Sequence, residues 1–527
     1  MGYGYRVGEV ALPGMLPIRE GVKVSNFKSS KDRTAMQYQI GPVCPCVAPP
    51  MPDNRHGPSA CAGALYRYCR KMPPIDRAKL RELKAHCRAL VAKTFDPLPV
   101  DVNLDVAEWL AGTHYTQARI DELQRLYDGR VGQVPNVLDG QCKSFVKVET
   151  YGAFKYPRAI NSRDDYFKVF TGPAFKRIEE VVFSHPVFIK HIPYHERCNY
   201  VSGLLGEQGY YYVTDYTSFE GSFTKEVMDA LEMQLYEHML RNHPKLFSVI
   251  RKHLTGTNTC RFGAFTIKTE ATRMSGDMCT SLGNGFSNWV ILDYLCTKWD
   301  IAYNAVFEGD DCLMAVSKPM SSAMYDGLGF TIKLDKVESF RTASFCGMVF
   351  AGDGEMVGDP KKILLNFGWS HSPLARSRKN ARALLKSKAL SLLYQYPRCP
   401  ILASFAHNLL CELADVQAAK DCDYHTFMIS QWAVKYKEET QVQFDLGPSD
   451  EVREMFAMTY GISAFDQKRL ESMPPNLVVQ DWSVLGLYDG DADLFAYRSE
   501  YVRCSCEPAV DMGGAISFDT VVPKPEP

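Results

Sequence analysis

The segment AVFEGDDCLMAV, residues 305–316, carries two adjacent carboxylates, Asp310 and Asp311, at a glycine-containing turn between two short apolar runs. Apolar runs on both sides of such a turn predict a β-hairpin. Adjacent carboxylates on a tight turn present the hard oxygen ligands that Mg²⁺ prefers. Gly-Asp pairs are also ordinary turn residues and recur later in this chain, so the hairpin needs support from other motifs before it indicates a metal site.

A second acidic motif lies upstream, in VTDYTSFEGS at residues 213–222. An apolar run ends at Asp215, and helical spacing follows from Lys225 to Leu240, so this region predicts a strand, a carboxylate and then a helix. By itself, Asp215 could simply cap a turn. If the strand instead pairs with the 305–316 hairpin, Asp215 faces Asp310, and three carboxylates converge where two metal ions could bridge them.

Between these two motifs lies RMSGDMCTSLGN, residues 273–284. Ser275-Gly276 gives a flexible loop at the start of a helix that we expect from Asp277 to Lys298. Thr280 and Asn284 are four residues apart and therefore share one face of that helix. Small polar side chains on a face turned towards the carboxylates could contact a ribose. Many helices carry a Thr and an Asn, but the whole string is far more specific than this pair.

The ordered set of three motifs resembles motifs A, B and C of the RNA-dependent RNA polymerases of positive-strand RNA viruses. RMSGDMCTSLGN is most similar to the tombusvirus and nodavirus-related group, and further matches extend from about residue 140 to residue 472. The resemblance implies template-directed transfer of nucleotides from NTPs by a two-metal mechanism, for genome replication and transcription. It implies Mg²⁺, with Mn²⁺ as a substitute, bound by Asp215, Asp310 and Asp311.

A basic segment around residues 143–163 resembles motif F and implies contacts with the triphosphate. There, Arg158 would hold phosphate oxygens in a forked geometry that Lys cannot reproduce. Glu220 stands where motif A of this family usually ends in Asp. The residues that the resemblance implies in nucleotide binding are Lys147, Lys155, Arg158, Arg163, Glu220, Ser275, Gly276, Thr280 and Asn284.

Two later segments also match the family. GFTIKLDK, residues 329–336, resembles motif D, in which either Lys333 or Lys336 could be the catalytic proton donor. We expect Lys336, because it follows Asp335 in the Asp-Lys pairing of other positive-strand polymerases. Phe345-Cys346-Gly347 is similar to motif E, the primer grip.

Two other functions compete with this hypothesis. A reverse transcriptase shares the carboxylates, but it excludes ribose with a bulky aromatic residue where this chain has Glu220 and Gly221. A polymerase-derived RNA-binding scaffold without catalysis is the alternative from another class. Clustered acids that repel one another would bring such a scaffold no benefit, so the sequence favours the polymerase.

The fold that the resemblance implies is α+β, a right hand with fingers, a palm built on an antiparallel sheet flanked by helices, and a mainly helical thumb. Helical spacing dominates from about residue 365 to 475, which agrees with such a thumb. The boundaries we expect are an N-terminal arm at 1–75 that braces fingers and thumb, fingers at 76–210 and 241–270, palm at 211–240 and 271–364, thumb at 365–506, and a flexible tail at 507–527.

Charge and hydropathy limit the partners. The 60 Lys and Arg residues nearly balance the 61 Asp and Glu residues, so RNA has to be met by a local basic patch. We expect no transmembrane segment, because no run approaches the roughly 18 to 20 apolar residues that span a bilayer. Seventeen cysteines without a secretory signal indicate reduced thiols.

The resemblance completes the list of expected partners and the location. It implies an RNA template, nascent RNA and NTPs, and no DNA. It also implies replication complexes in the host cytoplasm that another component, such as a viral auxiliary replication protein, tethers to host membranes.

Overall fold

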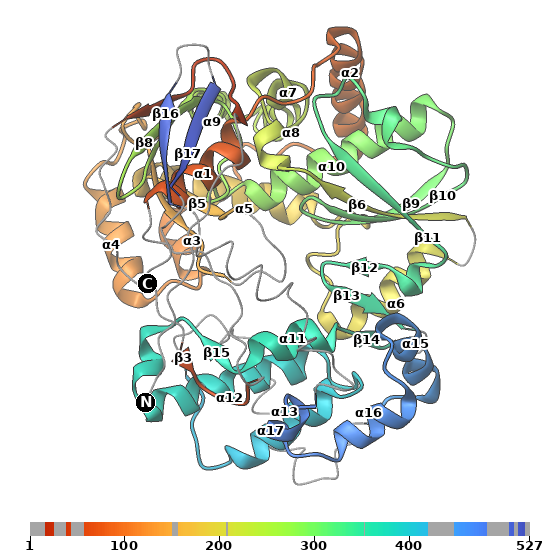
Figure 1. Cartoon of the computed structure of the whole chain (residues 1–527). Helices are drawn as coiled ribbons and strands as arrows, with labels where there is room; N and C mark the ends of the chain where they lie inside the picture. Colours follow the sequence, from red (N-terminus) through yellow and green to blue (C-terminus); the bar gives the residue numbers. More distant parts are fainter. Residues whose placement is uncertain are drawn as a thin grey trace.

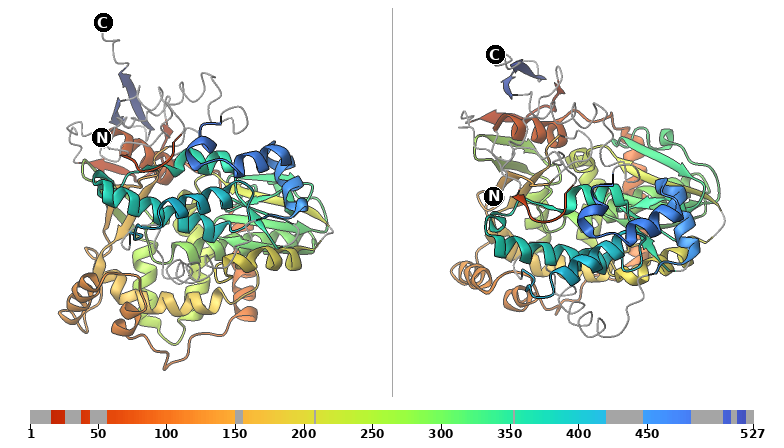
Figure 2. Two further views of the ribbon diagram at one scale, coloured as in Figure 1. Left: turned by 90° about the horizontal axis from the view of Figure 1, so that it is seen from below. Right: turned by 60° about the horizontal axis from the view of Figure 1, so that its bottom comes forward.

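The computed structural model describes residues 16–25, 38–43, 57–149, 156–206, 209–351, 354–419, 447–481, 505–510 and 515–521. Helices and several small sheets make up this mixed α+β structure (Figure 1, Figure 2). The α+β class predicted from the sequence is therefore confirmed. Among the described helices, none is long and apolar enough to cross a membrane.

The predicted carboxylates lie on a four-stranded antiparallel sheet in the order β11-β6-β10-β9. Its strands are β6 (Tyr210–Tyr216), β9 (Tyr303–Glu308), β10 (Asp311–Val316) and β11 (Ile332–Val337). The predicted hairpin is confirmed, and so is its pairing with the strand that carries Asp215. Strand β10 is apolar after Asp311 because side chains on both of its faces are buried.

Two hydrophobic cores lie on opposite faces of this sheet. One core contains Tyr212 and Met314 and is covered by helices that flank the sheet in Figure 1. The other contains Tyr211 and Leu313 and continues into the C-terminal helices. The helices of the first core include α2 (Arg77–Thr94), α5 (Asp165–Val182), α7 (Lys225–Ala230), α8 (Glu232–Met239), α9 (Pro244–Leu254) and α10 (Thr280–Lys298).

Two helix predictions need correction. The single helix expected from Lys225 to Leu240 is two helices, because the backbone at Leu231 is not helical. The helix expected from Asp277 begins at Thr280 instead. The Thr280 hydroxyl donates hydrogen bonds to two backbone carbonyls of the preceding turn, which holds that turn outside the helix.

A five-stranded sheet in the order β2-β8-β7-β4-β5 brings three distant segments together. Its strands are β2 (Lys23–Ser25), β8 (Thr266–Glu270), β7 (Thr257–Arg261), β4 (Cys142–Val146) and β5 (Ala159–Arg163). One face packs on α1 (Gly57–Ala64) and on the π-helical turn η1 (Leu65–Cys69), and the other face is open to solvent. Two short helices, α3 (Val106–Ala111) and α4 (Gln117–Asp128), pack beside α5 in a smaller core.

The chain after residue 360 is mainly helical where the structure describes it, in agreement with the sequence pattern. Its helices are α11 (Pro360–Phe367), α12 (Arg378–Gln395), α13 (Leu402–Glu412), α15 (Asp450–Tyr460), α16 (Ala464–Glu471) and α17 (Pro475–Val478). They share a core with α6 (Tyr194–Leu205) and the small sheet β12 (Ser344–Phe345), β13 (Met348–Phe350) and β14 (Met356–Val357). In Figure 1 these helices occupy the lower half of the view.

The described parts of the N-terminal segment pair with two separate regions. Strand β2 joins the edge of the five-stranded sheet, whereas β3 (Tyr38–Gln39) pairs with β15 (Trp369–Ser370) beside the C-terminal helices. A third strand, β1 (Leu16–Pro17), pairs with the C-terminal end of the chain. The segment therefore makes backbone contacts with parts of the fold that lie far apart in sequence.

The flexible tail expected at 507–527 includes two strands in the part that the structure describes. Strands β16 (Ser505–Val510) and β17 (Ala515–Val521) form an antiparallel hairpin, and β17 also pairs with β1. Apolar and polar residues alternate from Ile516 to Asp519 in β17, which is the period of a strand. The composition of the last residues obscured this alternation.

Candidate active site

The two adjacent carboxylates lie where two strands meet. Asp311 pairs with Glu308 across the hairpin, so Gly309 and Asp310 form a two-residue turn. The φ angle of Gly309 is 65°, a left-handed conformation that favours glycine. On the other side of β10, Cys312 pairs with Thr214, which sets Asp215 beside Asp311.

The carboxyl groups affect one another's ionisation. Burial raises the pKa of Asp310 to about 7, and the negative charges of Glu220 and Asp311 add to this effect. Burial also raises the pKa of Asp311, and Asp215 and Glu308 add to it. The structure thus brings together the acids that the sequence singled out on two separate strands.

The donor set fits hard divalent cations. Carboxyl groups that repel one another gain stability when a cation neutralises them, and carboxylate oxygens are ligands that Mg²⁺ prefers. Within the described residues, no three His, Cys, Asp or Glu side chains already stand in metal-binding geometry. Binding would therefore require Asp215, Asp310 and Asp311 to close around the ions.

The polar face of α10 contacts these acids. Asn284 is 4% exposed, and its Nδ2 donates to Glu220 Oε1 at 3.4 Å. Its buried Oδ1 makes no hydrogen bond within the described part of the chain. Thr280 shares the helix face, but its hydroxyl donates to the carbonyls of Met274 and Asp277, at 2.9 and 2.8 Å.

Asn288, one turn further along α10, is a residue that the sequence analysis missed. Its side chain is buried, and Nδ2 donates to the carbonyl oxygens of Asp310 (2.9 Å) and Gly309 (3.4 Å). Its Oδ1 accepts a hydrogen bond from the Tyr216 hydroxyl at 3.3 Å. Asn288 therefore ties the carboxylate turn to strand β6. The spacing of four residues from Thr280 to Asn284 to Asn288 could have revealed it.

The Ser275-Gly276 loop is anchored to the five-stranded sheet. Ser275 Oγ donates to the carbonyl of Ala159 at 2.6 Å and lies 2.6 Å from the Tyr68 hydroxyl. A Cβ at Gly276 would lie 2.7 Å from the carbonyl oxygen of Asn161, so only glycine fits against β5. These contacts give both residues an evident structural role, and any contact with a nucleotide stays a prediction.

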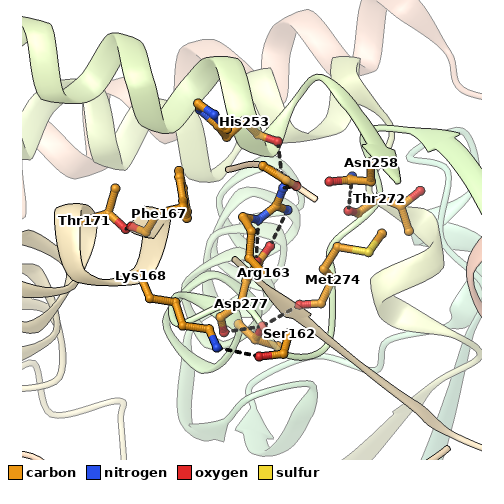
Figure 3. Close-up of polar contacts among 12 residues, drawn as sticks. Ser162, Arg163, Phe167, Lys168, Thr171, His253, Asn258, Thr272, Met274 and Asp277 are labelled. Atoms are coloured by element: carbon orange, nitrogen blue, oxygen red, sulfur yellow. Dashed lines mark hydrogen bonds and ion pairs between the residues drawn. The ribbon is translucent and has the colours of Figure 1, made fainter. Parts of the chain in front are cut away.

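Arg163 is buried in the protein interior. Its side chain is 2% exposed and forms a bidentate ion pair with Asp277, with Nε–Oδ1 and Nη2–Oδ2 distances of 2.7 and 2.8 Å (Figure 3). Its Nη1 donates to the carbonyls of Gly140 and His253. Every nitrogen of the guanidinium is occupied inside the protein, which gives Arg163 an evident structural role, and its contact with a nucleotide stays a prediction.

Three other basic residues were expected at the nucleotide site, Arg158, Lys147 and Lys155. Arg158 is exposed, and its positive charge lowers the pKa of both Asp310 and Asp311, opposing the effect of burial. Lys147 Nζ lies 2.9 Å from Glu149 Oε2, and Arg158 Nε lies 3.7 Å from Glu149 Oε1. Lys155 lies outside the described residues.

The strand register distinguishes the two candidate lysines. Lys333 pairs with Asp215 across β11 and β6, so their side chains share one face of the sheet. Lys336 pairs with Tyr212, whose ring is buried in the core on the opposite face, and its Nζ lies 5.1 Å from the centre of the Tyr210 ring. The register therefore favours Lys333 over the expected Lys336.

The expected primer-grip residues adjoin the carboxylates. Cys346 is exposed, and its Sγ donates to Asp311 Oδ2 at 3.3 Å. Cys346 and Gly347 both have positive φ angles, 51° and 78°, which turn the chain sharply at this contact. Phe345 is fully buried and packs in the core beneath.

Comparisons with known proteins identify the family of this chain. Residues 124–480 match the family model described as viral RNA dependent RNA polymerase. The RNA-directed RNA polymerase of tobacco necrosis virus (strain D) is 23% identical over 418 residues, which cover 71% of this chain and 55% of the relative.

Two further viral polymerases also match. The RNA-directed RNA polymerase of greasy grouper nervous necrosis virus is 25% identical over 213 residues, 36% of this chain and 21% of the relative. That of maize chlorotic mottle virus is 23% identical over 388 residues, 66% of this chain and 38% of the relative. The matched region thus spans from about a fifth to about half of the length of these relatives. The resemblance to the tombusvirus and nodavirus-related group is confirmed.

Arg163→Ala should destabilise the protein by about 3–5 kcal/mol, because it leaves the Asp277 carboxylate buried without its partner. Replacing both residues, in Arg163→Met with Asp277→Leu, should recover most of this loss. Urea unfolding of the wild type and of the two variants checks the expectation. Unchanged stability together with weaker nucleotide binding in Arg163→Ala would favour the nucleotide-binding assignment.

Metal-free wild type should become less stable relative to Asp310→Asn as the pH rises from about 4 to about 7. The pKa of Asp310 is about 7 in the folded protein and about 3.9 in an unfolded chain, so the unfolded state releases the proton first. Above about pH 7 the difference should stay constant. Thermal unfolding in a chelator, with the exposed Asp101→Asn as control, measures it, and parallel curves for wild type and Asp310→Asn would contradict it.

Proposed function

Because the chain belongs to the viral RNA dependent RNA polymerase family, we propose that it copies an RNA template by transferring nucleotides from NTPs, as in positive-strand RNA viruses. The observation that carries this proposal is the pairing of β6 with β10, which gathers Asp215, Asp310 and Asp311 at one end of a sheet. The polymerase names of the matched relatives support it.

We place the parts of a right hand on this fold. The four-stranded sheet with α10 corresponds to the palm, the five-stranded sheet and its helices to the fingers, and the helices after residue 365 to the thumb. The pairing of β2 with the fingers sheet and of β3 with β15 supports an N-terminal arm that braces fingers against thumb.

Each side chain of the site has a defined part in this reaction. Asp215, Asp310 and Asp311 would hold two Mg²⁺ ions, or Mn²⁺ in their place, which would activate the primer 3′-hydroxyl and neutralise the triphosphate. Arg158, whose charge already reaches Asp310 and Asp311, orients the triphosphate through a forked contact. Lys147 adds a second positive charge to the same segment.

Asn284 and Glu220 select the sugar. A site built to hydrogen-bond a hydroxyl group leaves its own polar atoms unpaired when a deoxyribose binds, which costs affinity. The buried Oδ1 of Asn284, together with the Glu220 carboxylate that accepts from Nδ2, offers such polar atoms. RNA template, nascent RNA and NTPs are the expected partners. Membrane association would depend on a tether supplied by another component, such as an auxiliary replication protein.

Lys333 supplies the proton to the leaving pyrophosphate. Its Nζ lies 2.6 Å from Asp335 Oδ2, and this hydrogen bond raises the pKa of Lys333 and keeps it protonated. The negative charge of Asp215 contributes in the same direction. A protonated amine on the carboxylate face of the sheet is suited to general-acid catalysis.

Asp215→Ala and Asp310→Ala should each abolish RNA synthesis while the protein stays folded. Removal of a metal ligand withdraws the cation from the reacting groups and should lower the rate by several powers of ten. Magnesium-dependent incorporation of labelled nucleotides on a primed RNA template measures this, with Asp101→Asn as a matched exposed control. Near-normal incorporation by either alanine variant would refute the proposed activity.

Lys333→Leu should lower kcat about 10²-fold with little change in the KM for nucleotides, because proton transfer is slowed and binding is not. The same change at Lys336 is the matched control, since that lysine stands on the same strand but pairs with Tyr212. Single-turnover incorporation across a pH range separates the two. A larger defect in Lys336→Leu than in Lys333→Leu would return the role to Lys336.

A further inference from the structure

A cavity of about 340 Å³ lies at the outer edge of the four-stranded sheet. It is next to the Tyr303 end of β9, whereas the carboxylate turn follows the Glu308 end of that strand. Helices α2, α6 and α10 and the turn at residues 185–187 form the other walls, and α2 and α10 lie against each other here (Figure 1). None of the lining residues takes part in the proposed nucleotidyl transfer.

A chain of hydrogen bonds forms one wall of the cavity. Trp289 Nε1 donates to the Tyr303 hydroxyl at 3.0 Å, and this hydroxyl donates to Asp293 Oδ1 at 2.7 Å. His86 Nε2 lies 2.7 Å from the other carboxylate oxygen, Asp293 Oδ2. Burial alone would raise the pKa of Asp293, but the hydrogen bonds from His86 and Tyr303 lower it. Both carboxylate oxygens are therefore already paired, and this wall is ordered without a ligand.

Two donors in the walls have no acceptor. Lys93 is exposed in the last turn of α2, and its ammonium group makes no hydrogen bond or ion pair within the described part of the chain. His185 Nδ1 accepts from the Val187 amide at 3.5 Å, so the neutral ring carries its proton on Nε2. Burial lowers the pKa of His185, which keeps the ring neutral. The unpaired N–H groups of Lys93 and His185 require a ligand that accepts hydrogen bonds.

The remaining lining is apolar or aromatic. Leu90, Val187 and Leu204 are half-buried and line the cavity. The rings of His185 and Trp289, which also line it, have their centres 4.6 Å apart. Aromatic side chains pack favourably against another flat ring system. Because a cavity of roughly 150 Å³ holds one benzene ring, a cavity of about 340 Å³ has room for two fused rings with a small charged group.

We propose that this cavity binds a bicyclic aromatic anion, with the anionic group at Lys93 Nζ and His185 Nε2 and the rings against Trp289 and the aliphatic side chains. A neutral aromatic compound would satisfy the two donors less well, and a cation would be repelled by the Lys93 ammonium group. The binding can be measured without RNA or NTPs, so the proposal does not depend on the polymerase function.

The cavity shares two elements with the carboxylate turn. Trp289 follows Asn288 on α10, and Asn288 Nδ2 donates to the carbonyl of Asp310. Strand β9 leads from Tyr303 directly into the same turn. A ligand in the cavity would contact α10 and β9 at once. Since it would bind only the folded protein, it should raise the temperature of unfolding.

The probe for the test is 1-naphthoate, which combines two fused rings with a carboxylate. Its neutral counterpart is 1-naphthalenemethanol. Isothermal titration calorimetry with the full chain measures the Kd of each compound. The wild type should bind 1-naphthoate about tenfold more tightly than the alcohol, because hydrogen bonds to a charged group are the stronger ones. 1-Naphthoate should also raise the Tm more than the alcohol does.

Variants of Lys93 test the place of the anionic group. Lys93→Ala should weaken the binding of 1-naphthoate about tenfold and leave that of the alcohol unchanged, whereas Lys93→Arg should retain most of the affinity. The matched control is Arg81→Ala, which removes an exposed cation from the same helix about 18 Å away. It should bind both compounds as the wild type does.

A variant that fills the cavity tests the place of the rings. Leu204→Phe should abolish the binding of both compounds, and thermal unfolding shows whether this variant is folded. Lys93 is exposed, so its variants decide the question even if Leu204→Phe is unstable. The proposal fails if the wild type does not bind 1-naphthoate, if it binds the alcohol equally well, or if Lys93→Ala binds like Arg81→Ala. Full binding by a folded Leu204→Phe variant would also overturn it.

Discussion

The buried ion pair between Arg163 and Asp277 is the contact on which the catalytic arrangement depends. Two charges removed from water are tolerated only when each is fully paired, and here the guanidinium also donates to the carbonyls of Gly140 and His253. One side chain thus fixes four segments of the chain, including the loop before α10 (Figure 3). The direction of α10, and with it the position of Asn284 and Asn288 against the acids, follows from this anchor.

The carboxylate cluster is placed by packing rather than by attraction. Acids that raise one another's pKa repel, so the two cores on either side of the β11-β6-β10-β9 sheet must hold the strands in register. Glu308 is neutralised separately, because Arg197 Nη1 lies 3.2 Å from Glu308 Oε2 and is almost completely buried. The negative charge without an ion-pair partner therefore lies on Asp215, Asp310 and Asp311, the residues proposed to hold cations.

The sequence predicted a local feature correctly where the spacing of apolar residues or a single turn determined it. The hairpin around Gly309, the strand that ends near Asp215 and the helical C-terminal region all appear as expected. The ion pair of Arg163 with Asp277 could not be predicted, because burial depends on tertiary contacts and a basic residue near basic neighbours gives no sign of its partner. The choice between Lys333 and Lys336 depended on strand register, which three residues of spacing cannot fix without knowledge of the opposite strand.

Strand pairing, which the sequence alone does not fix, also explains how a chain of net charge −1 can bind negatively charged ligands. Acidic and basic residues nearly balance in number, so the composition shows no excess of either sign. Pairing of β6 with β10 gathers acids at one sheet, whereas pairing of β8, β7 and β4 gathers cations on another. Each cluster costs folding stability on its own, and each is made from segments far apart in sequence. The buried Arg163–Asp277 ion pair joins the five-stranded sheet to the loop before α10, the helix that contacts the carboxylates.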